Sequence, residues 1–141
     1  MSEKPSYSLQ HILLLDSNFT RSWSIDFDEP NFTNSVDIEV EDTRGDNMLS
    51  VTLHLTFKAG VGDDYQVRAY IKMVGIFSTT AKGELSIDQF ASINAPAIIF
   101  PFIREHLSSL SVKAGINPIL LSPVNFVQHS EQKKKKKTSS K

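Results

Sequence analysis

Cysteine is absent from the 141 residues, which excludes disulfides, thiolate metal sites and a cysteine nucleophile. Long apolar runs are also absent: stretches such as residues 12–15 and 97–100 are far shorter than the roughly 20 residues of a membrane-spanning helix. Residues 1–8 lack the apolar core of a secretion signal. We therefore expect one cytoplasmic domain that does not insert into a membrane.

The usual signals of an enzyme are missing as well. The sequence has no glycine-rich phosphate loop and no nucleophile elbow. The four histidines fall on different expected elements without the spacing of metal ligands. We expect neither catalysis nor a cofactor nor a metal.

Charge is distributed unevenly along the chain. The net charge is only −1, but residues 133–137 and Lys141 are all lysine, so the preceding part of the chain is clearly acidic. Between residues 26 and 46 many carboxylates face a single base, Arg44. An acidic body argues against a nucleic-acid surface on the folded domain.

The first half of the chain has the alternation of β-strands. Apolar and polar residues alternate over residues 36–41, 51–57 and 65–73, and turn-forming residues separate these runs at 42–47 and 59–64. A further strand is expected at residues 7–16, although residues 12–15 are continuously apolar. The pattern predicts a four-stranded antiparallel meander.

The second half changes to a helical period. Ser86 and Gln89 resemble a capping box and predict a short helix to about Ile93. Pro96 suits the start of a longer helix that Gly115 would end, and Pro101 inside it is expected to produce a kink. We thus predict an α+β fold, with a long kinked helix and a short helix packed on one face of the sheet.

The end of the chain looks irregular. Pro118 and Pro123 bracket apolar residues, which favours an extended connection over residues 116–126. The tail loses its apolar content and its lysines repel one another. We therefore divide the chain into a disordered N-terminus at 1–6, one domain at 7–128 and a disordered lysine-rich tail at 129–141.

Two blocks of sequence carry a family resemblance. Residues 94–105, NAPAIIFPFIRE, and residues 114–126, AGINPILLSPVNF, resemble in order and spacing the signature of the SecB export chaperones. Residues 75–78, GIFS, resemble the end of the family's last strand, and residues 16–19, DSNF, weakly resemble part of its first.

The resemblance implies a chaperone that binds unfolded polypeptides, including preproteins, in apolar grooves and keeps them competent for export. It also implies a homotetramer built as a dimer of dimers. Exposed apolar surface suits that role, since unfolded chains offer scattered apolar side chains. We assign the client contacts to these residues: Ile76, Phe77, Phe100, Phe102, Ile116, Ile119, Leu120, Leu121, Val124 and Phe126.

Coupling to the SecA motor is less well supported by the residues. The resemblance implies docking through acids on the exposed sheet face, of which this chain keeps Asp16 but has Thr20 and Tyr70 at two other such positions. The family's final helix and acidic tail are expected to be missing after Phe126. A chaperone or adaptor of a toxin–antitoxin system, which binds one dedicated partner, is the alternative.

Simpler interpretations remain open for several of these features. Helical spacing favours packing against the sheet for Phe100, Phe102 and Ile103, whereas the extended 116–126 segment is the better groove candidate. The lysine run fits a solvated terminus better than an RNA or lipid site.

Overall fold

The computed structural model describes residues 7–80 and 86–139, with side chains up to Lys133. Four strands precede all the helices, which confirms the predicted α+β class. The predicted disordered segment 1–6 lies outside the described residues. The elements are β1 Tyr7–Arg21, β2 Phe32–Gly45, β3 Met48–Val61, β4 Asp64–Thr79, α1 Ile87–Gln89, the π-helical turn η1 Phe90–Asn94, α2 Ala95–Lys113 and α3 Phe126–Ser139.

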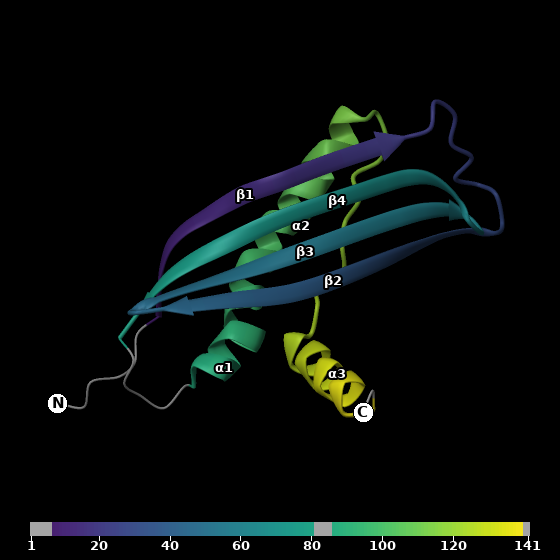
Figure 1. Ribbon diagram of the computed structural model, residues 1–141. Helices are drawn as coiled ribbons and strands as arrows, with labels where there is room; N and C mark the ends of the chain where they lie inside the picture. Colours follow the sequence, from purple (N-terminus) through teal and green to yellow (C-terminus); the bar gives the residue numbers. More distant parts are fainter. Residues whose placement is uncertain (1–6, 81–85, 140–141) are drawn as a thin grey trace.

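The strands form one antiparallel sheet in the order β1-β4-β3-β2. Strands β2, β3 and β4 make the predicted meander, through tight turns in which Asn47 and Gly62 have positive φ. The position of β1 corrects the prediction, because β1 lies beside β4. Residues 22–31 therefore cross the end of the sheet to reach β2 at the opposite edge (Figure 1).

Strand β1 is irregular, and its pairing with β4 is interrupted by two bulges. Its pairing with β4 shifts register between Leu9 and His11 and again between Leu14 and Asp16. Each bulge inserts a residue and reverses the face on which the following side chains lie. Between the bulges the pairing is regular: Ile12 and Leu14 lie on the same face as Gly75 and Met73, and Leu13 lies on the opposite face with Val74. The apolar run therefore places apolar side chains on both faces of β1.

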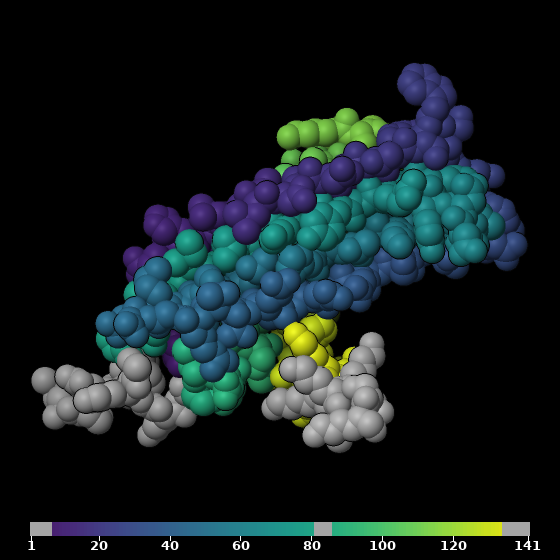
Figure 2. All heavy atoms as spheres, in the orientation of Figure 1, coloured from purple at the N-terminus to yellow at the C-terminus, as the bar shows by residue number. Residues whose placement is uncertain are grey.

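The two faces of the sheet differ. One face, which we call the inner face, is covered by α2 and carries the odd-numbered residues of β3 and β4, such as Leu53 and Ile71. The outer face carries the even-numbered residues of these strands and has no described helix over it; it faces the viewer in Figures 1 and 2. One buried and one open face is the usual consequence of period-two alternation in antiparallel strands.

The helical segment runs from Ile87 to Lys113 with a π-helical turn before its longer part. Ser86 caps it as predicted, since its side chain accepts a 3.1 Å hydrogen bond from the Gln89 backbone N–H. Pro96 has no N–H to donate, and the Ala95 N–H instead bonds to the Phe90 carbonyl, five residues back. One widened turn thus accommodates the proline within a continuous helical segment. The short and long helices, which were predicted as separate, are joined.

The end of α2 and the connection after it agree with the sequence. Gly115 has a φ of 76°, its N–H bonds to the Val112 carbonyl, and the Ile116 N–H bonds to the Ser111 carbonyl, which together make a Schellman cap. Residues 117–125 contain no helix or strand, as the two prolines predict. In extended form, the chain then runs back behind the strands and across them, from the end of α2 to α3 (Figure 1).

A helix in place of an irregular tail is the second correction. The structure has α3 over Phe126–Ser139, where we predicted disorder from residue 129 and no family-like final helix. The Asn125 side chain accepts a 3.2 Å hydrogen bond from the Gln128 N–H and so supports the first turn. Phe126 anchors that turn in the core, an anchor that composition alone did not reveal.

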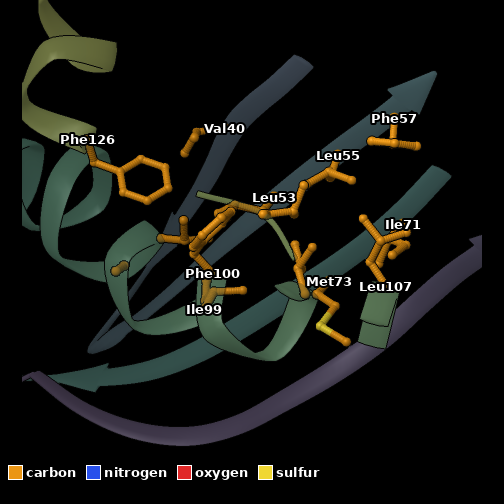
Figure 3. Packing of buried hydrophobic residues seen from close by; sticks show 14 of the residues in the cluster. Val40, Leu53, Leu55, Phe57, Ile71, Met73, Ile99, Phe100, Leu107 and Phe126 are labelled. Atoms are coloured by element: carbon orange, nitrogen blue, oxygen red, sulfur yellow. The ribbon is translucent and has the colours of Figure 1, made fainter. Parts of the chain in front are cut away.

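The core lies between the inner face and α2. Ile99, Ile103 and Leu107 are fully buried on one side of α2. In Figure 3, Ile99, Phe100 and Leu107 of α2 point toward strand residues such as Leu53, Leu55 and Ile71. Helix α2 crosses β3 and β4, and this placement leaves β2 at the edge of the covered area.

Candidate functional site

A groove of about 1400 Å³ lies on the inner face beside the core. We call it the β2 groove. Its floor is the inner face of β2, one wall is the 116–124 segment, and α3 contributes His129, Gln132 and Lys133 at one end. Phe27 and Phe32 close the other end. This is large enough for several side chains of a bound polypeptide.

The floor is apolar because β2 alternates. Val36, Ile38 and Val40 pair with Phe57, Leu55 and Leu53 of β3 and share their face. Those β3 residues are buried under α2, whereas Val36 is 44% exposed. The groove is therefore a continuation of the core surface that α2 does not reach.

Ser111 holds the wall in place. Its side chain is fully buried and accepts a 2.9 Å hydrogen bond from the Ile119 N–H, while its single O–H proton is shared between the Leu107 and Ser108 carbonyls at 3.0 and 2.8 Å. The backbone around Ile119 pairs with no strand, and this hydrogen bond fixes it to α2. The apolar side chains around Ile119 stay beside the groove without secondary structure of their own.

Helix α3 is attached to the free edge of β2 through two side chains. The His129 Nε2 atom lies 2.8 Å from the Ile38 carbonyl oxygen, and the Lys133 Nζ atom donates to the Val40 carbonyl oxygen at 2.8 Å. The Phe126 ring packs edge-on against Phe100 at 6.0 Å between ring centroids. These contacts place α3 across one end of the groove.

Most of the client-contact residues predicted from the second half of the chain come together here. The groove-lining residues among them are Phe100, Ile116, Ile119, Leu120, Leu121 and Val124. Leu120 is the most open of the large apolar side chains in this wall, at 68% exposed. Phe126 lies behind them in the core.

The other predicted contacts lie elsewhere. Phe77 is fully buried and packs edge-on against Phe90, so its side chain is not accessible in this structure, and the strand-end resemblance reflects a packing position. Ile76 alternates with it and lies on the outer face. Phe102 is 47% exposed on α2 and does not line the β2 groove.

Several lining residues were missed by sequence reasoning. Val36, Ile38 and Val40 were read only as a strand face, and nothing local marks Phe27 or Phe32 as groove residues. The sequence did contain one sign of an open strand face here. The residues that alternate with these three β2 residues are strongly acidic, which indicates an edge strand that other elements cover only partly. His129 and Lys133 were missed because α3 was not predicted.

The outer face holds the acid that the family resemblance associates with motor docking. Asp16 lies there, opposite Lys72 of β4. Nearby, the Tyr70 hydroxyl and His54 Nδ1 are 2.6 Å apart, and His54 Nε2 lies 2.6 Å from a carboxylate oxygen of Glu41. Desolvation, and then the negative charges of Asp16, Glu41 and Glu39, raise the pKa of Tyr70 above its ordinary value.

The described part of the chain offers no group of three or more His, Asp or Glu side chains that could hold a metal ion. None of the described helices is long and apolar enough to cross a membrane. The arrangement suits reversible contact with apolar side chains of an extended chain.

An α+β module with a half-covered sheet and an open apolar groove is the class that these observations define. The family model described as preprotein translocase subunit SecB matches residues 3–137. The chain belongs to the SecB family.

Individual relatives agree with the family match. A protein-export protein SecB from Nitrosococcus oceani is 38% identical over 81 residues, which are 57% of this chain and 49% of that protein, so the match spans about half of the relative. Another, from Ectopseudomonas mendocina, is 29% identical over 128 residues, 89% of this chain and 80% of the relative.

The fold also matches a solved structure. A SecB-like chaperone of Mycobacterium tuberculosis, solved in complex with a ChAD peptide from the HigA1 antitoxin, superposes with a TM-score of 0.70. The match covers 84% of this chain and 90% of that one at 13% identity. This likeness confirms the predicted α+β architecture.

Proposed function

We propose that this protein is a SecB-family chaperone that holds unfolded polypeptides in the β2 groove and keeps them competent for export. The observation that carries the proposal is the groove itself: an apolar strand face with an extended apolar wall, left open beside a well-packed core. Contact between a client and these two apolar surfaces involves no covalent reaction, so the proposed role is non-catalytic. A cytoplasmic location is part of the proposal.

The residues proposed to contact clients are those that line the groove and remain accessible. Leu120 and Ile119 from the wall and Val36 from the floor are the foremost of these. Transferring one apolar side chain from water contributes about 1.5–3 kcal/mol when it becomes fully buried. A few such contacts give useful affinity while leaving each one replaceable, which suits clients of unrelated sequence.

The outer face supports weak coupling to SecA. Asp16 keeps an acid at one position implicated by the family resemblance, but Thr20 is neutral and Tyr70 is bonded to His54. We propose that SecA binds this protein less tightly than it binds relatives that retain all the acids. Titration of SecA with the wild type and with Thr20→Glu/Tyr70→Glu tests this; the double variant is expected to bind more tightly.

Assembly as a homotetramer is also proposed. Support comes from β1, an edge strand on which Leu13, Leu14 and Leu15 are exposed. An uncovered edge with large apolar side chains favours association. The mass in solution, measured alone and with an unfolded client, tests the assembly and client binding together.

Suppression of aggregation is the decisive experiment. A chemically denatured model enzyme is diluted into buffer with stoichiometric wild-type protein, and light scattering is followed. The proposal expects scattering to fall in proportion to the chaperone added. Unchanged scattering, with the chaperone folded by circular dichroism, would contradict the holding function.

A dedicated partner is the second candidate function. Thr20 and Tyr70, which stand in place of acids on the outer face, favour it. The structurally similar SecB-like chaperone was solved with an antitoxin peptide, which supports a ligand of this kind. In this case the groove would bind one peptide tightly and unrelated unfolded chains weakly. A toxin–antitoxin pair encoded beside the gene, together with nanomolar binding to a peptide from that antitoxin, would support it.

A further inference from the structure

We propose that α3 is a latch over a strand-docking site on the free edge of β2. In this proposal, His129 and Lys133 occupy the carbonyl oxygens of Ile38 and Val40, which an extended client segment would otherwise use to pair with β2. The proposal rests on the proposed function and adds how a client backbone is bound and what competes with it. It concerns the edge of β2, whereas the groove contacts concern its inner face.

The geometry of β2 provides the site. β2 is an edge strand, paired with β3 on one side only. In an antiparallel strand the N–H and C=O of one residue point to the same side, so residues that alternate along the strand point their polar groups to its free edge. The contacts at the Ile38 and Val40 carbonyls identify these two residues as such a pair.

The α3 contacts reproduce what a pairing strand would supply. His129 and Lys133 are one helical turn apart and reach carbonyls two residues apart on β2. Both oxygens are thereby satisfied by side chains rather than by a neighbouring strand. Such side-chain contacts are one way in which proteins protect an open sheet edge.

The occupant that fits this edge is an extended polypeptide with apolar side chains at alternate positions. Its backbone N–H groups would replace His129 and Lys133, and its inward side chains would enter the β2 groove over Val36 and Ile38. Main-chain pairing is independent of sequence, which suits an unfolded client. The same strand would therefore use the edge and the groove together.

The charge of Lys133 favours the closed position of α3 but leaves it reversible. Lys133 lines the groove together with the acidic residues Glu39, Glu41 and Asp42. Its hydrogen bond to a carbonyl is charge-assisted, yet Lys133 is exposed, so water can take its place. Opening at this end requires loss of the Lys133 contact, whereas Phe126 keeps the start of the helix anchored in the core.

The test compares the wild type with His129→Ala/Lys133→Met, which removes both donors. Lys113→Met is the control: it removes the same charge from an exposed site on α2 outside the groove. The probes are a fluorescein-labelled peptide of alternating valine and serine, and the same peptide N-methylated on the backbone nitrogens of alternate residues. N-methylation removes the donors that would pair with β2 but leaves the side chains in place.

The latch model predicts that the double variant binds the unmethylated peptide about five- to tenfold more tightly than the wild type, and that the control does not. The N-methylated peptide should gain nothing. Amide hydrogen exchange should show new protection at Ile38 and Val40 when the unmethylated peptide is bound. Faster exchange of the α3 amides in the free double variant would report the loss of the latch without any client.

Other results would overturn the inference. Equal or weaker binding by the double variant would make α3 a wall of the groove and not a competitor. An equal gain for both peptides would show that opening the groove matters and strand pairing does not. Failure of the proposed function is seen separately, as failure of the wild type to hold reduced, carboxymethylated α-lactalbumin.

Discussion

The two halves of the inner sheet face show the same sequence pattern and have different surroundings. On β3 and β4, alternating residues such as Leu53 and Ile71 are fully buried beneath α2. On β2, Val36 and Ile38 alternate in the same way but face a groove. Alternation therefore determines which side chains share a face, and the path of α2 decides whether that face becomes core or binding surface.

This difference separates stability from function within one sheet. The covered half buries apolar surface permanently and holds the fold together. The open half keeps a similar surface available at the edge of the sheet. Substitutions can therefore be chosen that affect one property and leave the other unchanged, and they are ordered below by the size of the expected effect.

The largest effect is expected in the covered half. Ile103 is fully buried on the sheet side of α2, and Ile103→Ala leaves a cavity there. We expect the free energy of unfolding to fall by about 2–5 kcal/mol. Urea denaturation at a fixed protein concentration measures it, since assembly would make stability depend on concentration. If the free energy of unfolding fell no more than when an exposed residue is replaced by alanine, the covered and open halves would not differ.

A smaller loss is expected at Gly75, where α2 lies close against β4. A Cβ added at Gly75 would lie 2.9 Å from both Cγ1 and Cδ1 of Ile99. Gly75→Ala should therefore destabilise by about 1–3 kcal/mol through overpacking. Ile99→Val removes Cδ1, so the double variant should recover part of the loss. Losses that simply add would show that the Gly75–Ile99 contact is not the cause.

In the open half, a substitution should weaken client binding and leave stability nearly unchanged. Leu120 is 68% exposed in the groove wall, so Leu120→Ala removes little buried surface from the folded protein. We expect affinity for an unfolded client to fall about three- to tenfold, with unfolding free energy changed by less than about 0.5 kcal/mol.

The matched control for Leu120→Ala is Val112→Ala. Val112 is 57% exposed on α2 and lies outside the groove. Its truncation should change neither client affinity nor stability. If both variants weakened binding equally, general surface hydrophobicity and not the β2 groove would hold the client.

Sequence reasoning predicted the fold and the extended wall of the groove, but not the groove floor on β2 or helix α3. The reasons for this difference are physical. Helix caps, turns and the proline-bracketed connection depend on local chemistry at Ser86, Gly115 and Pro118, and these predictions were confirmed. The place of β1 beside β4 depends on contacts between distant residues, and two bulges hid its alternation. Helix α3 depends on Phe126 packing against Phe100, a tertiary contact that overrides an unfavourable composition.

The smallest effect is expected at Phe102, which sequence reasoning grouped with the client contacts. It follows Pro101 on α2, is 47% exposed and does not line the β2 groove. Phe102→Ala should therefore change the free energy of client binding by less than about 0.5 kcal/mol. The free energy of unfolding should change by no more than that. Titration calorimetry and urea denaturation at several protein concentrations measure both. A drop in affinity that matches Leu120→Ala would extend the client surface around α2, and a loss of assembly without a change in affinity would place Phe102 between subunits.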